Sequence, residues 1–572
     1  MKILVLAKQV PDVNKISFDA STGRIIREGV PLSINSFDKK AVEESIRIKE
    51  NLGAEISVAT MGPPQASDIL NESLRMGADR GILITDRQFG GADTWATSKI
   101  LSRFIEIEKP DIVLCGKYSL DGETSQVPPQ IARFSKYSLA TSVSSIEFPE
   151  SGNLILERET EAGIEKIEVS MPIVISVSEK INKARKIPEG TPEMRDKITT
   201  VNAKDLAIGI NGIADSLTVV SGTESVQSSR QVKFISIDEA IKIIHESEII
   251  ASKETASFEK LSLGEQRDGK TLLGIAMDSP EVSVEIASEL SRIAIREGFN
   301  VSIAGNIEPG SLKGISCHNY YYIRSRRNDE LTEELISLMD KIKPEFVIFP
   351  STVNGREVSA TISAARNLGL TADCVKISYE DGKLIQYKPA FGGGIVARIT
   401  SKTKPEMATV RPGILMKGIS EKPFNTVEIA PSKKSYVKEI SFTPVSEEFK
   451  PLSGSGLVIG LGMGARSREL IGKVVNISKS LDAAVAATRP VVDMKLIPRQ
   501  QQVGLTGIAI SPALYVAVGI SGHDNHLVGL RYAKQILAVN KDPNAPIFRS
   551  ADYGVIADSA EFITALENLV VH

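Results

Sequence analysis

Cysteine and histidine are scarce in this chain of 572 residues, which has three and five of them respectively. Cys115, Cys317 and Cys374 lie far apart and form no CxxC motif. This spacing gives no basis for a cysteine-based zinc or iron–sulfur site, or for a disulfide framework. We therefore expect no metal centre and three buried, apolar thiols.

Long hydrophobic runs are also missing. No segment approaches the roughly 20 apolar residues of a membrane span, and the N-terminal MKILVLA is too short for the apolar core of a signal peptide. The formal net charge of −3 gives no electrostatic argument for nucleic-acid binding, which uses a clustered basic surface. We expect a cytoplasmic protein with no nucleic-acid partner.

The chain does contain a regular alternation of short β-branched runs and amphipathic stretches. Strands are predicted near residues 3–7, 56–60 and 112–115, and a helix over 38–51 that Gly53 ends. Continuous apolar strands that alternate with helices predict a parallel sheet covered on both faces.

The chain also repeats itself. KPDIVLCG at 109–116 corresponds to KPEFVIFP at 343–350, and LATS at 139–142 corresponds to LTAD at 370–373. Two copies of one α/β domain, roughly 230 residues apart, explain these pairs better than chance.

Three polar or proline-bearing segments separate the predicted domains: residues 180–197, 222–230 and 420–451. The predicted boundaries are 1–200 for a nucleotide-binding domain, 201–265 for an arm and linker, 266–419 for its repeat, 420–450 for a linker and 451–572 for a C-terminal domain.

The C-terminal domain carries the clearest indication of a ligand. Gly460-x-Gly462-x-Gly464 follows an apolar strand, and VGISGHDNH at 518–526 repeats the arrangement. Ligands of an open parallel sheet bind beyond the carboxyl ends of its strands, and glycines let backbone N–H groups approach a phosphate. Because acid–base side chains are almost missing there, the pattern indicates a large bound cofactor rather than hydrolysis.

Each piece also has a simpler explanation. The glycines lack the full GxGxxG spacing and are equally compatible with a tight turn that binds nothing. Arg489 could form a surface salt bridge instead of facing an anion. His523 and His526 could be solvated residues at the start of a helix.

Together, the C-terminal motifs resemble a known family. QVGLTG (502–507), YVAVGISG (515–522), AVNKDPNAPIF (538–548) and ADYGVIAD (551–558) are similar to the FAD domain of the α subunit of electron transfer flavoproteins. This resemblance implies an FAD site at the carboxyl ends of the last strands.

The rest of the chain resembles the same family. MKILVLAKQVPD (1–12) and GKYSLDGETSQVPPQIA (116–132) are similar to the β subunit, and GREVSATISAARNLGLTADC (355–374) and MATVRPG (407–413) to the first α domain. The chain thus resembles a β subunit and an α subunit fused in that order. The implied fold is α/β, with two related parallel-sheet domains of the nucleotide-binding type (adenine nucleotide alpha hydrolase-like) and a C-terminal doubly wound, Rossmann-like FAD domain.

The resemblance implies no catalytic residue, because the flavin carries the chemistry. Arg489 near the ring, Thr506 near N5 and His526 near O2 are expected to tune the flavin. The implied FAD-binding residues are Thr488, Arg489, Val503, Gly504, Thr506, Ser521, Gly522, His526, Asn540 and Asp558.

Three positions depart from the family pattern: Met463, Leu505 and His523. Met463 stands where the family has an arginine, so one cationic contact to FAD is missing, and Arg466 or Arg468 could replace it. The flavin potential is therefore expected to differ from that of the usual carrier.

A second nucleotide is implied in the β-like half, where ordinary members bind AMP and a bifurcating subgroup binds a second FAD. GADT at 91–94 resembles the subgroup, which favours a second FAD over AMP. The alternative is that Asp93 only caps a helix. The implied residues are Leu6, Asn35, Met61, Asp93, Thr94, Thr97, Asp121, Thr124, Ser125 and Gln126.

Partners follow from the same resemblance. Ile187 corresponds to an apolar anchor that docks dehydrogenases, with a buried isoleucine as the alternative. The expected function is an electron carrier between acyl-CoA or related dehydrogenases and a membrane quinone oxidoreductase. The alternatives are an electron-bifurcating enzyme that oxidises NADH and a non-redox nucleotide-binding protein.

Overall fold

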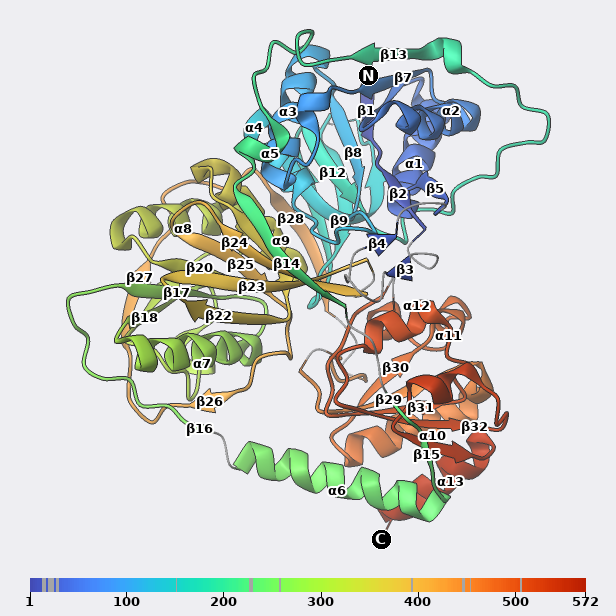
Figure 1. Ribbon diagram of the computed structural model, residues 1–572, viewed down its shortest axis with the longest axis vertical. Helices are drawn as coiled ribbons and strands as arrows, with labels where there is room; N and C mark the ends of the chain where they lie inside the picture. The colour runs from blue at the N-terminus through green and yellow to red at the C-terminus, as the bar shows by residue number, and fades with distance from the viewer. Residues whose placement is uncertain are drawn as a thin grey trace.

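The protein folds into three α/β bodies, shown from blue to red along the chain in Figure 1. The computed structural model describes residues 1–12, 17–18, 25–26, 30–150, 152–225, 230–256, 259–391, 394–444, 448–452, 454–504 and 507–571. Leu505 and Thr506 therefore lie outside the described residues.

The first body is built on a ten-stranded sheet. Seven neighbouring strands are parallel, from β13 to β9, and the last three are antiparallel. In spatial order they are β13 (Ile198–Val201), β7 (Arg80–Ile84), β6 (Glu55–Met61), β1 (Lys2–Leu6), β8 (Ile112–Gly116), β12 (Ile173–Val177), β9 (Ser138–Glu147), β10 (Leu154–Glu159), β11 (Gly163–Val169) and β28 (Lys438–Pro444).

Helices cover both faces of this sheet, as continuous apolar strands require. Alternate residues of β1 enter two cores: Ile3 and Val5 lie on one face, and Leu4 and Leu6 on the other. The helices are α1 (Ser36–Leu52) and α2 (Ser67–Met76) on the first face, and α3 (Thr94–Glu108) and α4 (Val127–Ser135) on the second. Two short hairpins, β2 (Gln9–Pro11) with β5 (Leu32–Ile34) and β3 (Ser17–Phe18) with β4 (Ile25–Ile26), precede α1.

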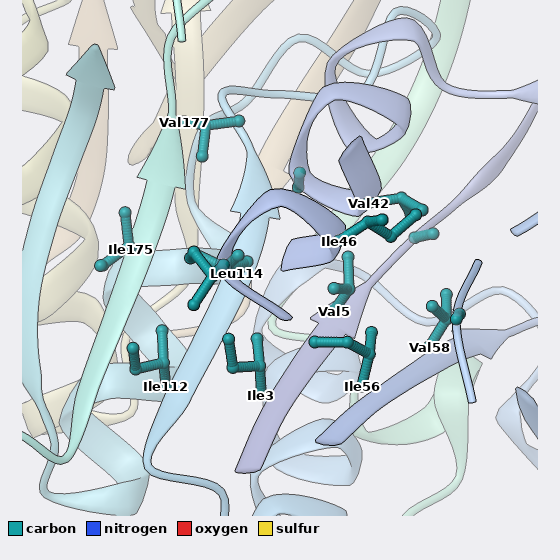
Figure 2. Close-up of a cluster of buried hydrophobic side chains, with 14 of the residues drawn as sticks. Ile3, Val5, Val42, Ile46, Ile56, Val58, Ile112, Leu114, Ile175 and Val177 are labelled. Atoms are coloured by element: carbon teal, nitrogen blue, oxygen red, sulfur yellow. The ribbon is translucent and has the colours of Figure 1, made fainter. Parts of the chain in front are cut away.

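Figure 2 shows the first of these cores. Each fully buried aliphatic side chain of this kind stabilises the fold by about 1.5–3 kcal/mol. The labelled side chains come from four parallel strands and α1: Ile3, Val5, Ile56, Val58, Ile112, Leu114, Ile175, Val177, Val42 and Ile46.

The second body has a seven-stranded parallel sheet and a four-stranded antiparallel sheet. The parallel order is β21 (Leu370–Cys374), β25 (Glu406–Val410), β20 (Phe346–Pro350), β17 (Thr271–Ala276), β18 (Asn300–Gly305), β19 (Asn319–Ile323) and β27 (Asn425–Ile429). The antiparallel order is β14 (Thr218–Ser225), β24 (Ile395–Ser401), β23 (Lys383–Ala390) and β22 (Lys376–Glu380). The helices are α7 (Pro280–Glu297), α8 (Asn328–Ile342) and α9 (Val353–Arg366).

The two bodies confirm the repeat that the sequence predicts. The order β7-β6-β1-β8-β12-β9 in the first corresponds to β19-β18-β17-β20-β25-β21 in the second. Matching residues also share the left-handed conformation: Lys109 and Lys343 have φ of 48° and 46°, and Ser142 and Asp373 have φ of 56° and 58°.

The two bodies also exchange strands. β14 follows the first body in the chain but pairs with β24 of the second, and β28 follows the second body but pairs with β11 of the first. Both strands lie in segments whose sequences predict linkers. The predicted domain boundaries stay predictions, but these segments contribute edge strands rather than only connections.

The C-terminal body is a six-stranded parallel sheet. Its order is β15 (Lys233–Phe234), β33 (Tyr553–Ile556), β32 (Gln535–Asn540), β31 (Leu514–Val518), β29 (Leu457–Leu461) and β30 (Ala484–Ala487). The helices are α10 (Arg468–Ser480), α11 (Arg489–Asp493), α12 (Asp524–Leu527) and α13 (Ser559–Val571). The order reverses between β29 and β31, which makes the sheet doubly wound as predicted.

The chain between the two repeats also crosses to this body. β15 extends its sheet, and α6 (Ile237–Ala256) packs against α13 along the bottom of Figure 1. The chain then returns to the second body through β16 (Glu259–Lys260), which pairs with β26 (Gly418–Ile419). The short helix α5 (Gly212–Asp215) lies before the crossing.

The fold can be compared with two expectations from the sequence, which are buried cysteines and the lack of a membrane-spanning helix. All three cysteines are buried and none forms a disulfide, which confirms the prediction of buried thiols. Among the described helices, none has the length and hydropathy needed to cross a membrane.

Candidate functional site

The candidate site of the C-terminal body lies where the strand order reverses, between β29 and β31. Gly462 donates its N–H to Val518 O at 2.9 Å, and Gly464 donates to Gly519 O at 3.0 Å. A Cβ on Gly462 would lie 2.2 Å from Gly519 O. These glycines are therefore required by the approach of the two loops, whether or not a phosphate is bound.

Thr488 and Arg489 begin α11 at the end of β30. The Thr488 N–H donates to Leu461 O at 3.0 Å, which fixes the start of the helix against β29. The Arg489 side chain is 54% exposed and forms ion pairs with Glu179 at 3.1 Å and with Asp493 at 3.4 Å. Glu179 belongs to the first body, so the surface salt bridge that the sequence leaves open is present and crosses between two bodies.

Val503 and Gly504 form the neighbouring loop. Val503 donates its N–H to Ala487 O at 3.1 Å. Gly504 has φ of 134°, and a Cβ there would lie 2.4 Å from Asn525 O. A side chain at position 504 would separate this loop from the segment that carries His526.

His526 is buried, and both of its ring nitrogens already have partners. Nδ1 donates to Val503 O at 3.0 Å, and Nε2 accepts from the Tyr515 hydroxyl at 3.0 Å. Burial lowers the pKa of His526 to about 4, so the imidazole is neutral at pH 7. Both ring nitrogens are therefore engaged by the protein itself, and the predicted hydrogen bond from His526 to a flavin requires one of these partners to be exchanged.

Tyr515 is the reason for this arrangement. Its ring is fully buried in β31, beneath Gly460, where a Cβ would lie 1.8 Å from the hydroxyl oxygen. A buried hydroxyl without a partner costs about 1–3 kcal/mol, and His526 removes that cost. Nothing in the sequence pattern indicates this pair.

The remaining predicted FAD residues share the same edge. Ser521 is exposed beyond β31, and Gly522, with φ of 90°, lies against Ile547. The Asn540 amide donates to Ile520 O at 3.0 Å, and Asp558 accepts from Ala560 N–H at 2.8 Å. The structure thus brings the described members of the predicted set together at the carboxyl ends of β30 to β33.

A second candidate site occupies the corresponding point of the first sheet, between β1 and β8. Leu6 and Met61 end β1 and β6, and Asn35 holds the loop after β8 through Tyr118 O at 2.9 Å and Leu120 N–H at 3.2 Å. Asp121 in that loop forms an ion pair with Lys8 at 2.7 Å. The loop spans residues 117–126.

The end of this loop has an unusual backbone. Glu123 and Ser125 have φ of 49° and 57°, which costs side-chain-bearing residues about 1–3 kcal/mol each. Thr124 lies between them and accepts Gln126 N–H at 3.4 Å. Within the described part of the chain, the Ser125 hydroxyl is buried and has no hydrogen-bond partner. An orphaned hydroxyl at the start of α4 is suited to an anion, which a helix N-terminus also favours.

Asp93 caps helix α3, which is the role expected if the GADT segment only starts a helix. Its carboxylate caps α3 by accepting Ala96 N–H at 2.9 Å. It also accepts Leu217 N–H at 2.8 Å and Thr218 N–H at 3.0 Å. Asp93 therefore anchors the chain that leads into β14, and its oxygens are engaged by the protein itself.

The other residues of the GADT segment still lie beside the loop. Thr94 donates its hydroxyl to Gln126 Oε1 at 2.5 Å, and Thr97 lies one turn into α3, with its N–H on Asp93 O at 3.0 Å. The indole N–H of Trp95 is buried without a partner among the described residues.

The equivalent point of the second sheet has no such loop. Only residues 351–352 separate β20 from α9. Asp278, at the end of β17, accepts from Asn354 at 2.8 Å, and Glu161 of the first body accepts the Val353 N–H at 2.8 Å. The first N–H group of α9 is thus already bound to a carboxylate. Of the two repeats, the first body has the long loop at this position.

Ile187, the predicted docking anchor, is half-buried. It packs against the core of the first body that contains α1 and α2. In this conformation Ile187 is neither free nor fully buried, and its docking role stays a prediction.

Comparison with known proteins decides the family. The electron transfer flavoprotein domain matches residues 22–206 and 323–445, more than half of the chain, and the electron transfer flavoprotein FAD-binding domain matches residues 451–531. The chain belongs to the electron transfer flavoprotein family. β-subunit relatives match its N-terminal half and α-subunit relatives its C-terminal half, consistent with a fused electron transfer flavoprotein.

Individual relatives support this arrangement. The electron transfer flavoprotein subunit beta of Thermoanaerobacterium thermosaccharolyticum is 46% identical over 208 residues, which are 36% of this chain and 78% of the relative. The subunit alpha of the same organism is 32% identical over 319 residues, 53% of this chain and 94% of the relative. The caffeyl-CoA reductase-Etf complex subunit CarD of Acetobacterium woodii is 45% identical over 212 residues, 36% of this chain and 80% of the relative.

The C-terminal edge of this electron transfer flavoprotein has groups that fit FAD. The half-exposed Arg489 guanidinium and the Ser521 hydroxyl lie at the point where the strand order reverses. A cation and hydroxyl groups at such a point suit a diphosphate and a flavin. Bound FAD would supply the redox chemistry, while these side chains would set its charge environment and its access to solvent.

Proposed function

We propose that this electron transfer flavoprotein is a carrier with FAD at the C-terminal edge. It accepts electrons from acyl-CoA or related dehydrogenases in the cytoplasm and passes them to a membrane quinone oxidoreductase. The observation that carries this proposal is the cluster of Thr488, Arg489 and Ser521 at one sheet edge within a matched FAD-binding domain, with Asp558 at the same edge beyond the matched residues.

The site itself favours a carrier over a self-contained catalyst. His526 is neutral and bound on both nitrogens, and Arg489 is held by two carboxylates. None of these groups is poised to move a proton to or from a substrate. Their contribution is electrostatic: Arg489 favours negative charge nearby, and the Glu179 carboxylate reduces that effect while the pair is formed.

A second nucleotide at the loop 117–126 is the next part of the proposal, with a second FAD preferred to AMP. The orphaned Ser125 hydroxyl and the left-handed Glu123 and Ser125 support an anionic ligand there. The preference for FAD rests on the GADT segment, in which Thr94 reaches Gln126 at the end of the loop. Because the carboxylate of Asp93 is engaged by the protein, the Ser125 hydroxyl is the polar group of this site that is free to meet such a ligand among the described residues.

Electron bifurcation with NADH is the second candidate function. It is favoured by the similarity to a subunit of a caffeyl-CoA reductase-Etf complex and by the long loop at the first-body site. The carrier proposal and this one differ in what reduces the protein.

Anaerobic reduction separates the two. The FAD-loaded protein is mixed with NADH alone, and separately with a catalytic amount of an acyl-CoA dehydrogenase and its substrate, while flavin absorbance is followed. The carrier proposal expects bleaching only with the dehydrogenase. Rapid bleaching with NADH alone would replace it by the bifurcation proposal.

Trp95, the only tryptophan, reports on the second site. It lies at the start of α3, next to Asp93 and Thr94. Loading flavin-depleted protein with FAD should quench its fluorescence in a second step, after the C-terminal site is filled. AMP loading should prevent that second step.

A further inference from the structure

A solvent-open cleft of about 1180 Å³ lies between the first body and the C-terminal body. One wall comes from Lys40 of α1, Ile164 of β11 and residues 179–183 after β12. The opposite wall comes from α10, α11 and residues 495–500. The cleft shares Arg489 with the predicted FAD residues and Arg468 with the candidate replacements for the missing cation, and the glycines at 460, 462, 464 and 504 do not line it.

Positive charge dominates this cleft. Seven of its lining residues are lysine or arginine and three are aspartate or glutamate, in a chain whose net charge is −3. Such a local excess concentrates anions between low-dielectric walls. The cleft is thus positively charged although the protein as a whole carries a net negative charge.

The acidic residues do not neutralise all of the cations. Glu179 is shared by Arg489 and Arg499, and Asp493 also pairs with Arg489. Of the five other cations, Lys180 pairs with Glu159 and Lys40 donates to Asn182 O. Among the described residues, no carboxylate lies within the 4.0 Å ion-pair distance of the remaining three, which are Lys183, Arg468 and Lys495.

The cations also disfavour one another. Burial, together with the charges of Arg489 and Arg499, lowers the pKa of Lys40, and burial lowers the pKa of Arg499. A bound anion would relieve this repulsion. Apolar side chains also line the cleft: Ile164 and Leu496 are half-buried, and Phe449, Ile471 and Val475 are buried behind them in the chain's cores. Inorganic phosphate alone would not use this apolar lining.

We propose that this cleft binds an organic phosphate of nucleotide size, with its phosphates at Lys183 and Lys495 and its apolar part on Ile164 and Leu496. The volume exceeds the range of about 300–1,000 Å³ in which cofactor-sized ligands are usually held. An adenosine diphosphate group has the required chemistry, and NADH and coenzyme A both contain it. The proposal does not depend on which nucleotide occupies the loop 117–126.

The test uses the FAD-loaded protein and titration calorimetry with ADP and with pyrophosphate. The cleft variant is Lys183→Gln/Lys495→Gln, which removes two charges, breaks no ion pair among the described residues and leaves Arg468 and Arg489 in place. The matched control is Lys313→Gln/Lys341→Gln, two exposed lysines outside the cleft. We expect ADP affinity to fall about tenfold in the cleft variant and to stay unchanged in the control.

Three results would overturn the proposal. They are no ADP binding by the wild-type protein, equal ADP affinity in the cleft and control variants, and pyrophosphate binding as tight as that of ADP. ADP bound only at the loop 117–126 would produce the second result, because the substitutions leave that loop intact.

Titration with NADH and with coenzyme A then identifies the source of the phosphate. Tighter binding of either one, lost in the cleft variant and weakened by salt, supports the proposal and names the ligand class. An unchanged flavin spectrum in the cleft variant separates this result from any failure of the FAD site.

Discussion

The buried pair of His526 and Tyr515 makes the stability of the C-terminal body depend on pH. The pKa of His526 is lowered by burial to about 4, whereas an unfolded histidine titrates near 6.5. The unfolded chain therefore binds a proton at a pH where the folded chain does not. Stability is complete above about pH 6.5 and is lost as the pH falls towards 4.

The size of the effect follows from the two pKa values. Between pH 8 and pH 5, this linkage lowers the free energy of unfolding by about 2 kcal/mol, or about thirtyfold in the unfolding equilibrium. His526→Asn removes the titration, and the asparagine amide can still donate towards Val503 O. The variant should be less stable than wild type at pH 8, because the Tyr515 hydroxyl loses its acceptor, but its stability should change about 2 kcal/mol less between pH 8 and pH 5.

The readout must report on the C-terminal body alone, because carboxyl groups elsewhere also titrate. Release of FAD from protein whose loop 117–126 has been loaded with AMP, followed by the rise of flavin fluorescence during denaturant unfolding, meets this requirement. His523→Asn is the matched control, since His523 is exposed in the same segment. If wild type and His526→Asn lose the same stability between pH 8 and pH 5, the assignment of a neutral buried His526 is wrong.

Three further predictions concern the contacts between bodies and nucleotide binding at the loop 117–126. Asp93→Ala should lower the free energy of unfolding, measured by chemical denaturation, by about 2–3 kcal/mol, because it removes the α3 cap and leaves the Leu217 and Thr218 N–H groups without their acceptor. The control is Asp68→Ala, which removes an exposed ion pair and should change the free energy of unfolding by less than about 0.5 kcal/mol. Ser125→Ala should weaken nucleotide binding at the loop 117–126 about fivefold in equilibrium dialysis, with no change in FAD bound at the C-terminal edge, and equal affinity would remove the hydroxyl from the site. Glu179→Gln removes the ion pairs of Glu179 with Arg489 and Arg499 of the C-terminal body, of which the half-exposed Arg489 pair contributes about 1 kcal/mol or less. The fraction of molecules in which the two bodies are separated should therefore rise at low ionic strength, seen as a larger radius in X-ray scattering, and an unchanged radius would mean that other contacts fix the orientation.

Most of the fold could be predicted because its signals are local and repeated. The buried strands are continuous apolar runs, and the repeat is carried by residues such as Lys109 and Lys343, which end equivalent helices in the left-handed conformation. The exchange of β14 and β28 could not be predicted. Both are exposed edge strands with polar sequences, so they lack the apolar pattern that marks a buried strand, and their partners lie far away in the chain.

The sequence could predict which residues share the sheet edge, because it shows where the strands end. It could not predict which side chains those residues contact. Thr488, Ser521 and Asp558 share an edge because parallel strands end together. The partners that determine side-chain roles come from other elements: Tyr515 binds His526, and Glu179 of the first body binds Arg489. No spacing in the sequence connects residue 179 to residue 489.

The number of flavins in each chain tests the central claim most directly. The purified protein is loaded with excess FAD, freed of unbound nucleotide and denatured, and the released FAD and AMP are counted per chain by chromatography. The account predicts two FAD and no AMP, one FAD from the C-terminal edge and one from the loop 117–126. One FAD with one AMP would contradict the second flavin, and no stoichiometric FAD at all would contradict the FAD site on which the proposed function rests.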